Sequence, residues 1–216
     1  MNMKILKYLK GGVKTLYLNF RVFPVKKALH LPVVVGPKVS MKGLHRGCIE
    51  CGDKTGIVNI GIKEGSFGMH HGIKSHIVFK GDGKLVCRGK ALLQSNFHLN
   101  IARTVTLGDR FSSNTGFILS CGKSITFGDD CLLGWNVTVI DGDGHKITSN
   151  GKITNADRGI DIGNHCWIAA NAAILKGVSL ADGTIVPYGS VITKSNTETN
   201  TIFNGKTLKA DVEWEH

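Results

Sequence analysis

The sequence lacks several signatures that would assign its chemistry directly. It contains no P-loop, no GxSxG and no Rossmann fingerprint, so the usual signals of nucleotide-triphosphate, serine-hydrolase and dinucleotide chemistry are missing. No apolar run approaches the roughly 20 residues of a membrane-spanning helix, and lysines interrupt any signal-peptide core in the first twenty residues. These absences favour a protein of the cytosol without a membrane span.

Proline is scarce, and the cysteines show no disulfide framework. The 216 residues include 28 glycines but only 4 prolines, and 42% are hydrophobic, which suits a corner-rich repeat fold in one domain. The lone Cys48-x-x-Cys51 motif has no second pair that would indicate a zinc site. We therefore expect small buried cysteines, a reducing compartment and no bound metal.

A period of six dominates residues 162–196. A large apolar residue leads each hexad, and a smaller residue stands four places further on. The leading residues are Ile162, Ile168, Ile174, Leu180, Val186 and Ile192. This period fits neither an α-helix nor a plain strand, but it is the signature of a parallel β-helix. Three short strands form each triangular coil, so about eighteen residues advance the chain by one strand spacing of roughly 4.8 Å.

The six-residue period becomes less regular toward the N-terminus, so the expected domain limits there depend on local composition. Regular winding is visible from Ile101, and shorter β-prone segments alternate with glycines from about Met41. We expect a β-helix domain over 41–197, with a basic segment at 1–40 and a C-terminal cap at 198–216.

A long polar insertion interrupts the winding. Roughly 17 residues between Val139 and Ile162 exceed one hexad, which predicts a loop over 141–161. His145 lies near its start, just after Asp141 and Asp143. A histidine beside a carboxylate is the standard general base near neutral pH. A solvated loop histidine would show the same spacing, so the residues alone leave both interpretations open.

Three phrases carry a family resemblance. They are IGNHCWI at residues 162–168, GSVITK at residues 189–194 and Gly144-His145 in the loop. With the hexads, they resemble the hexapeptide-repeat acyltransferases, in particular the galactoside and maltose O-acetyltransferases and the acetyltransferases of capsule and O-antigen gene clusters. The resemblance covers about residues 101–196. It implies an all-β, left-handed parallel β-helix and a homotrimer that moves an acetyl group from acetyl-CoA to a sugar hydroxyl in surface polysaccharide biosynthesis.

The resemblance also assigns roles to individual residues. His145 stands at the family's catalytic histidine position, and Asn114 lies near an asparagine that contacts the acceptor. Asp141 and Asp143 are the expected orienting carboxylates. The positions that line the acetyl-CoA groove are Ala170, Tyr188, Thr193 and Lys194. Trp135 and Trp167 flank hexad leaders, and we expect them to pack against the base of the loop. His165 points outward by register and is expected at a surface or interface.

The N-terminal segment holds nearly all of the net charge. Ten Lys or Arg residues and no acid precede Glu50, within a chain of formal charge +11. Residues 1–20 fit a helix with Ile5, Leu9, Leu16 and Phe20 on one side. Such a helix either caps the first coil or contacts the anionic inner membrane surface, beside lipid-linked sugars. The segment has no recognisable nucleic-acid-binding module, so we expect no nucleic acid partner.

Other functions stay open at this point. The acceptor could be a nucleotide-linked sugar, an amino-sugar or a small xenobiotic, or the β-helix could be a binding scaffold without catalysis. Zinc carbonic anhydrases share the architecture but need three histidines. His71 and His76 have a suitable spacing, and no third histidine precedes them at a comparable distance.

Overall fold

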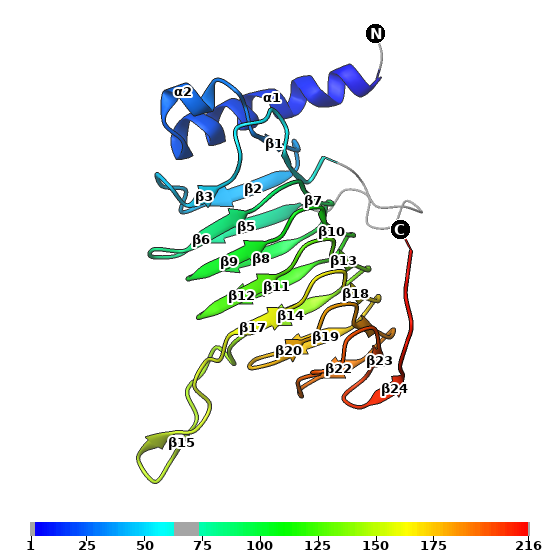
Figure 1. Cartoon of the computed structure of the whole chain (residues 1–216). Coiled ribbons are helices and arrows are strands. Elements are labelled where there is room, and N and C mark those ends of the chain that lie inside the picture. The colour runs from blue at the N-terminus through cyan, green and yellow to red at the C-terminus, as the bar shows by residue number, and fades with distance from the viewer. Residues whose placement is uncertain (1–2, 63–73, 216) are drawn as a thin grey trace.

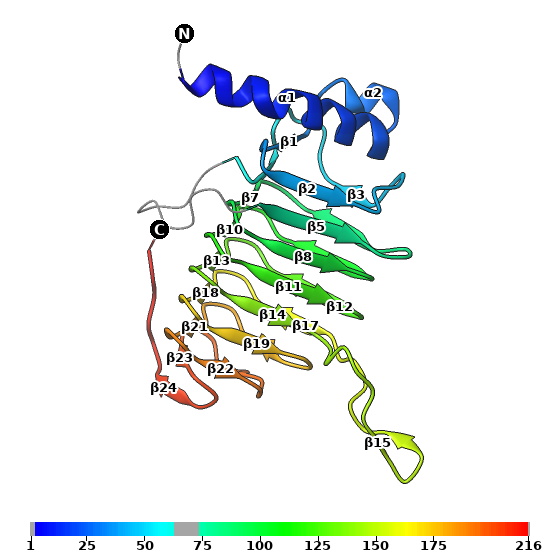
Figure 2. The ribbon, with the colours of Figure 1, turned by 180° about the vertical axis from the view of Figure 1, so that it is seen from behind.

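The computed structural model describes residues 3–62 and 74–215, with side chains from residue 12 onward. Helices α1 (Met3–Val22) and α2 (Val25–Ala28) lie across one end of a stack of short strands (Figures 1 and 2). Consecutive strands fall in turn on three parallel sheets, here called A, B and C, within the described residues. The fold is the left-handed parallel β-helix that the hexads and the family resemblance predicted.

The strands of successive coils stack in each sheet, and sheet A also includes β24, which pairs antiparallel with β23. Sheet A contains β1 (Val33–Val35), β4 (Val58–Ile60), β7 (Ala91–Leu93), β10 (Phe111–Ser113), β13 (Leu132–Leu133), β18 (Trp167–Ile168), β21 (Ile185–Val186), β23 (Ile202–Phe203) and β24 (Thr207–Lys209). Sheet B contains β2 (Val39–Lys42), β5 (Ser75–Phe79), β8 (His98–Ile101), β11 (Ile118–Cys121), β14 (Thr138–Ile140), β19 (Ala173–Leu175) and β22 (Val191–Ile192). Sheet C contains β3 (Ile49–Glu50), β6 (Lys84–Cys87), β9 (Thr104–Leu107), β12 (Ser124–Phe127), β17 (Ile160–Ile162) and β20 (Ser179–Leu180).

The prism has three edges, which are named here by the sheets that they join. The A/B edge links each sheet A strand to the next strand of sheet B, the B/C edge links sheet B to sheet C, and the C/A edge begins the following coil. Every coil therefore passes each edge once. Residues far apart in sequence lie close together when they occupy the same edge in neighbouring coils.

The coils before the loop are wider than the eighteen residues expected. Asp109 and Asp129 occupy equivalent corners 20 residues apart, whereas Asn164 and Asp182, after the loop, are 18 residues apart. The longer coils have four-residue strands in sheets B and C. Phenylalanines fill this wider interior, with the ring centroids of Phe111 and Phe127 5.0 Å apart. Aromatic rings thus add to the stacked aliphatic side chains in these wider coils.

Helix α1 caps the first coil by satisfying the free edge of strand β1. Thr15 Oγ1 accepts a hydrogen bond from Val35 N at 3.0 Å. One turn later, Asn19 Oδ1 accepts from Val33 N at 3.2 Å, and Asn19 Nδ2 donates to Val33 O at 2.7 Å. Two polar side chains on one helix face therefore form the hydrogen bonds that a neighbouring strand would otherwise form with β1. An edge strand protected in this way cannot pair with another chain.

The β-helix starts earlier than the sequence indicated. Strand β1 already pairs with β4 in parallel from Val33, so the expected boundary at Met41 is too late. Pro32 and Pro37 flank this strand, and the sequence places it in the basic segment expected at 1–40. At the other end, β23 extends sheet A and pairs with β24 in an antiparallel hairpin. The last residues then run back along the outside of the coils (Figure 1).

Candidate functional site

The predicted insertion leaves the prism at the B/C edge. It connects β14 to β17 and carries a small antiparallel hairpin of β15 (Thr148–Ser149) and β16 (Lys152–Ile153). The hairpin projects well beyond the coils (Figures 1 and 2). Residues 160 and 161 belong to β17, so the loop ends two residues before the expected limit. A polar excursion from a rigid scaffold is a favourable position for a functional site.

Asp141 anchors the start of this loop. Its buried carboxylate accepts hydrogen bonds from three successive backbone N–H groups of the coil before, at 2.6 Å from Gly122, 2.8 Å from Lys123 and 2.9 Å from Ser124. The side chain has no accessible surface. Asp141 therefore holds the loop to the scaffold and is not available to orient an acceptor, which corrects the role expected for it.

Asp143 is tied to partners other than the catalytic candidate. Its Oδ2 accepts hydrogen bonds from Lys176 Nζ and, at 2.7 Å, from Asn155 Nδ2. These hydrogen bonds, led by that from Lys176, hold the pKa of the Asp143 carboxyl below its usual range. The carboxylate is thus charged at neutral pH, but it supports the loop and does not contact the His145 ring.

His145 lies exposed on the wall of a hollow of about 370 Å³ at the loop base. Within the described part of the chain, its imidazole forms no hydrogen bond, so both ring nitrogens are accessible to substrates. Its backbone is fixed by Asn155, whose Nδ2 donates to His145 O at 2.7 Å while Oδ1 accepts from Ile147 N at 2.6 Å. Asn155 is a positioning residue that the sequence reasoning missed. Its place in the returning half of the loop was the only available signal.

The remaining candidates divide between two edges of the prism. Asn114, Ala170 and Tyr188 lie on the A/B edge, because each follows a sheet A strand. Thr193 and Lys194 follow β22 and lie on the B/C edge, the same edge as His145. One chain therefore does not bring all of the predicted site residues together.

One part of this β-helix matches a known family of repeats. Residues 159–194 match the model of the bacterial transferase hexapeptide family, described as six repeats. The chain carries the hexapeptide repeat of bacterial transferases. The matched residues are those in which the period of six is most regular, after the loop.

Individual relatives share this repeat. Over 107 residues the chain is 27% identical to the galactoside O-acetyltransferase of Escherichia coli (strain K12), covering 48% of this chain and 52% of that protein. Over 95 residues it is 34% identical to the polysialic acid O-acetyltransferase of Neisseria meningitidis, covering 43% of this chain and 40% of the relative. The chain thus spans about half the length of these relatives or less.

A solved structure extends the likeness to most of the fold. The crystal structure of the polySia-specific acetyltransferase NeuO superimposes with a TM-score of 0.60 at 21% identity. The match covers 85% of this chain and 72% of that chain. At this level of identity the likeness shows a shared hexapeptide-repeat fold and nothing about substrates.

Trp167, the first residue of β18, packs differently from the expectation. The Trp167 ring lies 6.1 Å from the ring of Trp214 in the C-terminal segment, so it does not support the loop base. His165 stacks on the same Trp214 ring at 4.5 Å, and Trp214 Nε1 donates to His165 O at 2.8 Å. His165 Nδ1 also lies 2.8 Å from Asp130 Oδ2. His165 therefore lies at a contact within one chain, where it holds the C-terminal segment against the hexapeptide-repeat coils.

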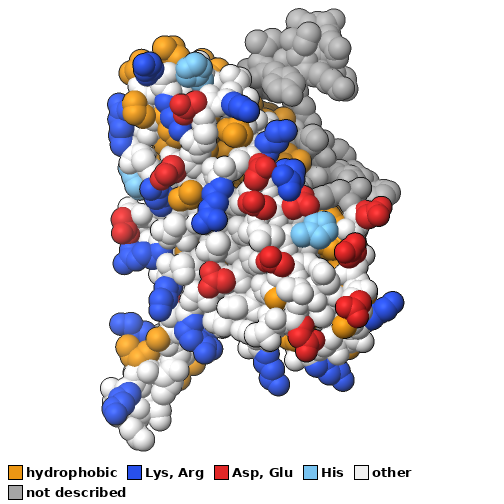
Figure 3. Space-filling model, viewed as in Figure 1, with side chains coloured by type: hydrophobic (Ala, Val, Ile, Leu, Met, Phe, Trp, Pro, Cys, Tyr) orange, Lys and Arg blue, Asp and Glu red, His pale blue; other side chains and the backbone are white. Residues whose placement is uncertain are grey.

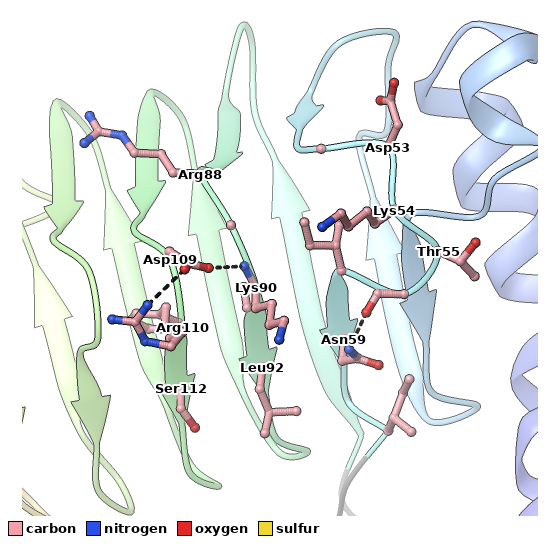
Figure 4. Close-up of a pocket in the computed structure, with 17 residues that line it drawn as sticks. Asp53, Lys54, Thr55, Asn59, Arg88, Lys90, Leu92, Asp109, Arg110 and Ser112 are labelled. Carbon is pink, nitrogen blue, oxygen red and sulfur yellow. Dashed lines mark hydrogen bonds and ion pairs between the residues drawn. The ribbon is translucent and has the colours of Figure 1, made fainter. Parts of the chain in front are cut away.

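A larger hollow of about 900 Å³ lies near the C/A edge of the early coils. Lys54, Arg88, Lys90 and Arg110 project around it (Figure 4). Its carboxylate at Asp109 is already engaged by the backbone N–H of Lys90 at 2.7 Å and by Arg110. The basic side chains outnumber the free acids, so the hollow suits an anionic group. None of the predicted site residues lines it.

The cysteines do not form a metal or redox site in the described structure. Cys48 and Cys51 are free and buried, and burial raises the pKa of the Cys51 thiol to about 11. A thiol with such a pKa is a poor nucleophile and a poor ligand at neutral pH. No group of three metal-ligating side chains occurs among the described residues. His71 lies outside these residues, and the His76 ring stacks on His98 at 5.1 Å.

Proposed function

We propose that this chain transfers an acetyl group from acetyl-CoA to a sugar hydroxyl in surface polysaccharide biosynthesis. The observation that carries the proposal is that the exposed His145 ring forms no hydrogen bond with any described residue. Asp141 holds the loop of His145 to the β-helix, and Asn155 fixes the His145 backbone within that loop. Two curated relatives that share the repeat are sugar O-acetyltransferases by name. A β-helix that only bound ligands would have no need for a positioned and accessible imidazole.

The chemistry assigned to His145 is general base catalysis. Acetyl-CoA supplies the acyl group as a thioester. His145 takes the proton of the acceptor hydroxyl as its oxygen bonds to the thioester carbonyl carbon, and it returns that proton to the sulfur when the carbon–sulfur bond breaks. A backbone N–H or the amide of Asn114 donates to the developing oxyanion. No metal takes part in this scheme.

We further propose a homotrimer with active sites shared between neighbouring chains. In the later coils the outer face of sheet B carries apolar side chains, with Ile118 44% exposed and Val191 60% exposed, whereas the outer face of sheet C carries mainly threonine and serine. If sheet B faces a threefold axis, the A/B edge of each prism meets the B/C edge of the next. This arrangement would bring Asn114 of one chain to His145 of another.

Mixed trimers test this arrangement. We expect His145→Ala and Asn114→Ala proteins to be weakly active alone, but a co-refolded equal mixture should regain activity. Random assortment would leave about a quarter of the sites with both wild-type residues. The measurement is acetyl-CoA consumption by each variant, the mixture and the wild type, with the trimer verified by light scattering. A mixture no more active than the mean of its two components would contradict shared sites.

Lys194 is assigned to the phosphates of CoA. It is exposed on the same edge as His145 and forms no ion pair among the residues that the structure describes. We expect Lys194→Ala to raise KM for acetyl-CoA about fivefold to tenfold with little change in kcat, since a lost phosphate contact weakens binding without touching the reacting atoms. Lys209 is an exposed lysine on β24, and Lys209→Ala is the control. A fall in kcat at unchanged KM would contradict the assignment.

The acceptor is proposed to be a saccharide, with acidic saccharides favoured by the basic hollow. Ser112 lines this hollow and lies on strand β10, two residues before Asn114. A chain of sugars crossing sheet A could therefore contact Lys90 while one hydroxyl lies near Asn114. Transfer to an amino-sugar nitrogen would use the same geometry.

The free cysteines suit a reducing compartment, so we propose a cytoplasmic location.

A further inference from the structure

Helix α1 has two faces in opposite surroundings. Its inner face is buried against the first coil through Thr15, Leu18, Asn19 and Val22. Its outer face repeats apolar residues at helical spacing, and α2 with its following residue adds two more. These residues, the outer apolar face, are Val13, Leu16, Tyr17, Phe20, Val25 and Leu29, and their exposed fractions range from 42% to 76%.

An apolar outer face is unexpected on a capping helix. A terminal cap normally presents a polar surface, because its task is to shield the open end of the solenoid from water. Thr15 and Asn19 already complete that task on the inner side. Clustered exposed apolar residues instead indicate a surface that another component covers. Within residues 3–62 and 74–215, no helix is long and apolar enough to cross a membrane.

The charge around this face identifies what covers it. Ten Lys or Arg residues and no acid precede Glu50. Exposed basic side chains at this end of the molecule include Arg21, Lys26, Lys38 and Lys42. Figure 3 shows hydrophobic side chains interspersed with lysine and arginine over the α1–α2 end. A second copy of the chain would bring two such positive fields together, which is unfavourable. An anionic lipid surface complements both the apolar and the basic side chains.

We propose that α1 and α2 dock the protein on an anionic membrane surface, with the outer apolar face at the level of the lipid headgroups. Because α1 lies across the end of the coil stack, the β-helix axis would stand away from the bilayer (Figure 2). The coil of β14 is four strand spacings below that of β2, so the root of the His145 loop would lie about 20 Å below the first coil, on which the cap packs. The site would then reach saccharides that extend from a lipid anchor. In a trimer with parallel prisms, the three caps would face the same bilayer and bind with avidity.

A matched pair of substitutions tests this docking. Leu16 on α1 and Leu208 on β24 are 48% and 50% exposed, and Figure 1 shows α1 and β24 at opposite ends of the molecule. Co-sedimentation uses the full chain and vesicles of phosphatidylcholine with or without phosphatidylglycerol. We expect Leu16→Gln to weaken binding to the anionic vesicles at least about tenfold and Leu208→Gln to leave it unchanged. Arg21→Gln and Lys26→Gln should each weaken it about fivefold, and added salt should weaken it further.

Folding and self-association are checked on the same proteins. The substituted side chains make no capping hydrogen bond, so the melting temperature of each variant should match that of the wild type. Equal binding of the Leu16→Gln and wild-type proteins to anionic vesicles would overturn the proposal, as would equal binding of the wild type to neutral and anionic vesicles. The proposal would also fail if the wild-type protein did not bind vesicles and Leu16→Gln caused a higher oligomer to dissociate, as measured by sedimentation velocity. Because acetyl transfer is measured separately, these outcomes do not depend on the proposed enzymatic function.

Discussion

Replacing His145 by alanine should lower kcat by about 10²- to 10⁴-fold while leaving acetyl-CoA affinity nearly unchanged. The expected loss is large because the imidazole is the general base of the scheme, and a carboxylate cannot take over. Asp141 is saturated by three backbone N–H groups, and Asp143 is engaged by Lys176 and Asn155. Steady-state kinetics gives kcat, and calorimetric titration of CoA gives the affinity.

The control for this substitution is another exposed histidine. His30 is exposed and follows α2 by two residues, and Figure 1 shows α2 at the opposite end of the molecule from the β15 hairpin, so His30→Ala should retain wild-type kcat. Asn155→Ala should fall between the two, because it releases the His145 backbone without removing the imidazole. Near-normal turnover by the His145→Ala protein would mean that His145 is a solvated loop residue and that the base lies elsewhere.

Replacing Asp141 by alanine should destabilise the fold by about 3–5 kcal/mol. The substitution leaves three backbone N–H groups without their acceptor and removes the tie between the loop and the coil before it. Asp141→Asn should cost less, since one oxygen remains to accept. Urea unfolding measures the stability, and kcat should fall with both variants because the root of the loop shifts.

Asp161 provides the matched carboxylate for this test. It lies on β17 at the other end of the loop, is exposed and faces out from sheet C. Asp161→Ala should change stability by less than about 0.5 kcal/mol. If Asp141→Ala proved as stable as Asp161→Ala, the three hydrogen bonds would not be the anchor of the loop.

The sequence predicted the later coils well because a single physical rule governs them. With 18-residue coils, Ile162, Leu180 and their equivalents fall at constant spacing and form one stacked ladder. The early coils break that rule. The coils that contain Phe111 and Phe127 are 20 residues long, and these rings fill the added width. The first coil is longer still, since Val33 pairs with Val58. Hexad counting therefore found the first coils irregular and missed β1 at Val33.

The site was predictable in its residue types but not in its contacts. The insertion and His145 stand out by spacing, whereas the partner of a carboxylate depends on which backbone N–H groups the fold presents to it. Nothing in the order Asp141, Asp143, His145 shows that the first aspartate is buried against Gly122. In the same way, Trp167 meets Trp214 only because the C-terminal segment folds back, which no local pattern records.

The most direct test of the account is acetyl transfer itself. Purified wild-type protein is incubated with acetyl-CoA and a panel of neutral galactosides and acidic oligosaccharides, and released CoA thiol and acetylated sugar are both quantified. We predict equal amounts of free CoA and of a base-labile sugar acetate ester, with acidic acceptors preferred and with product lost in His145→Ala. Thioester consumption without an acetylated sugar, or equal product from the wild-type and His145→Ala proteins, would contradict the account.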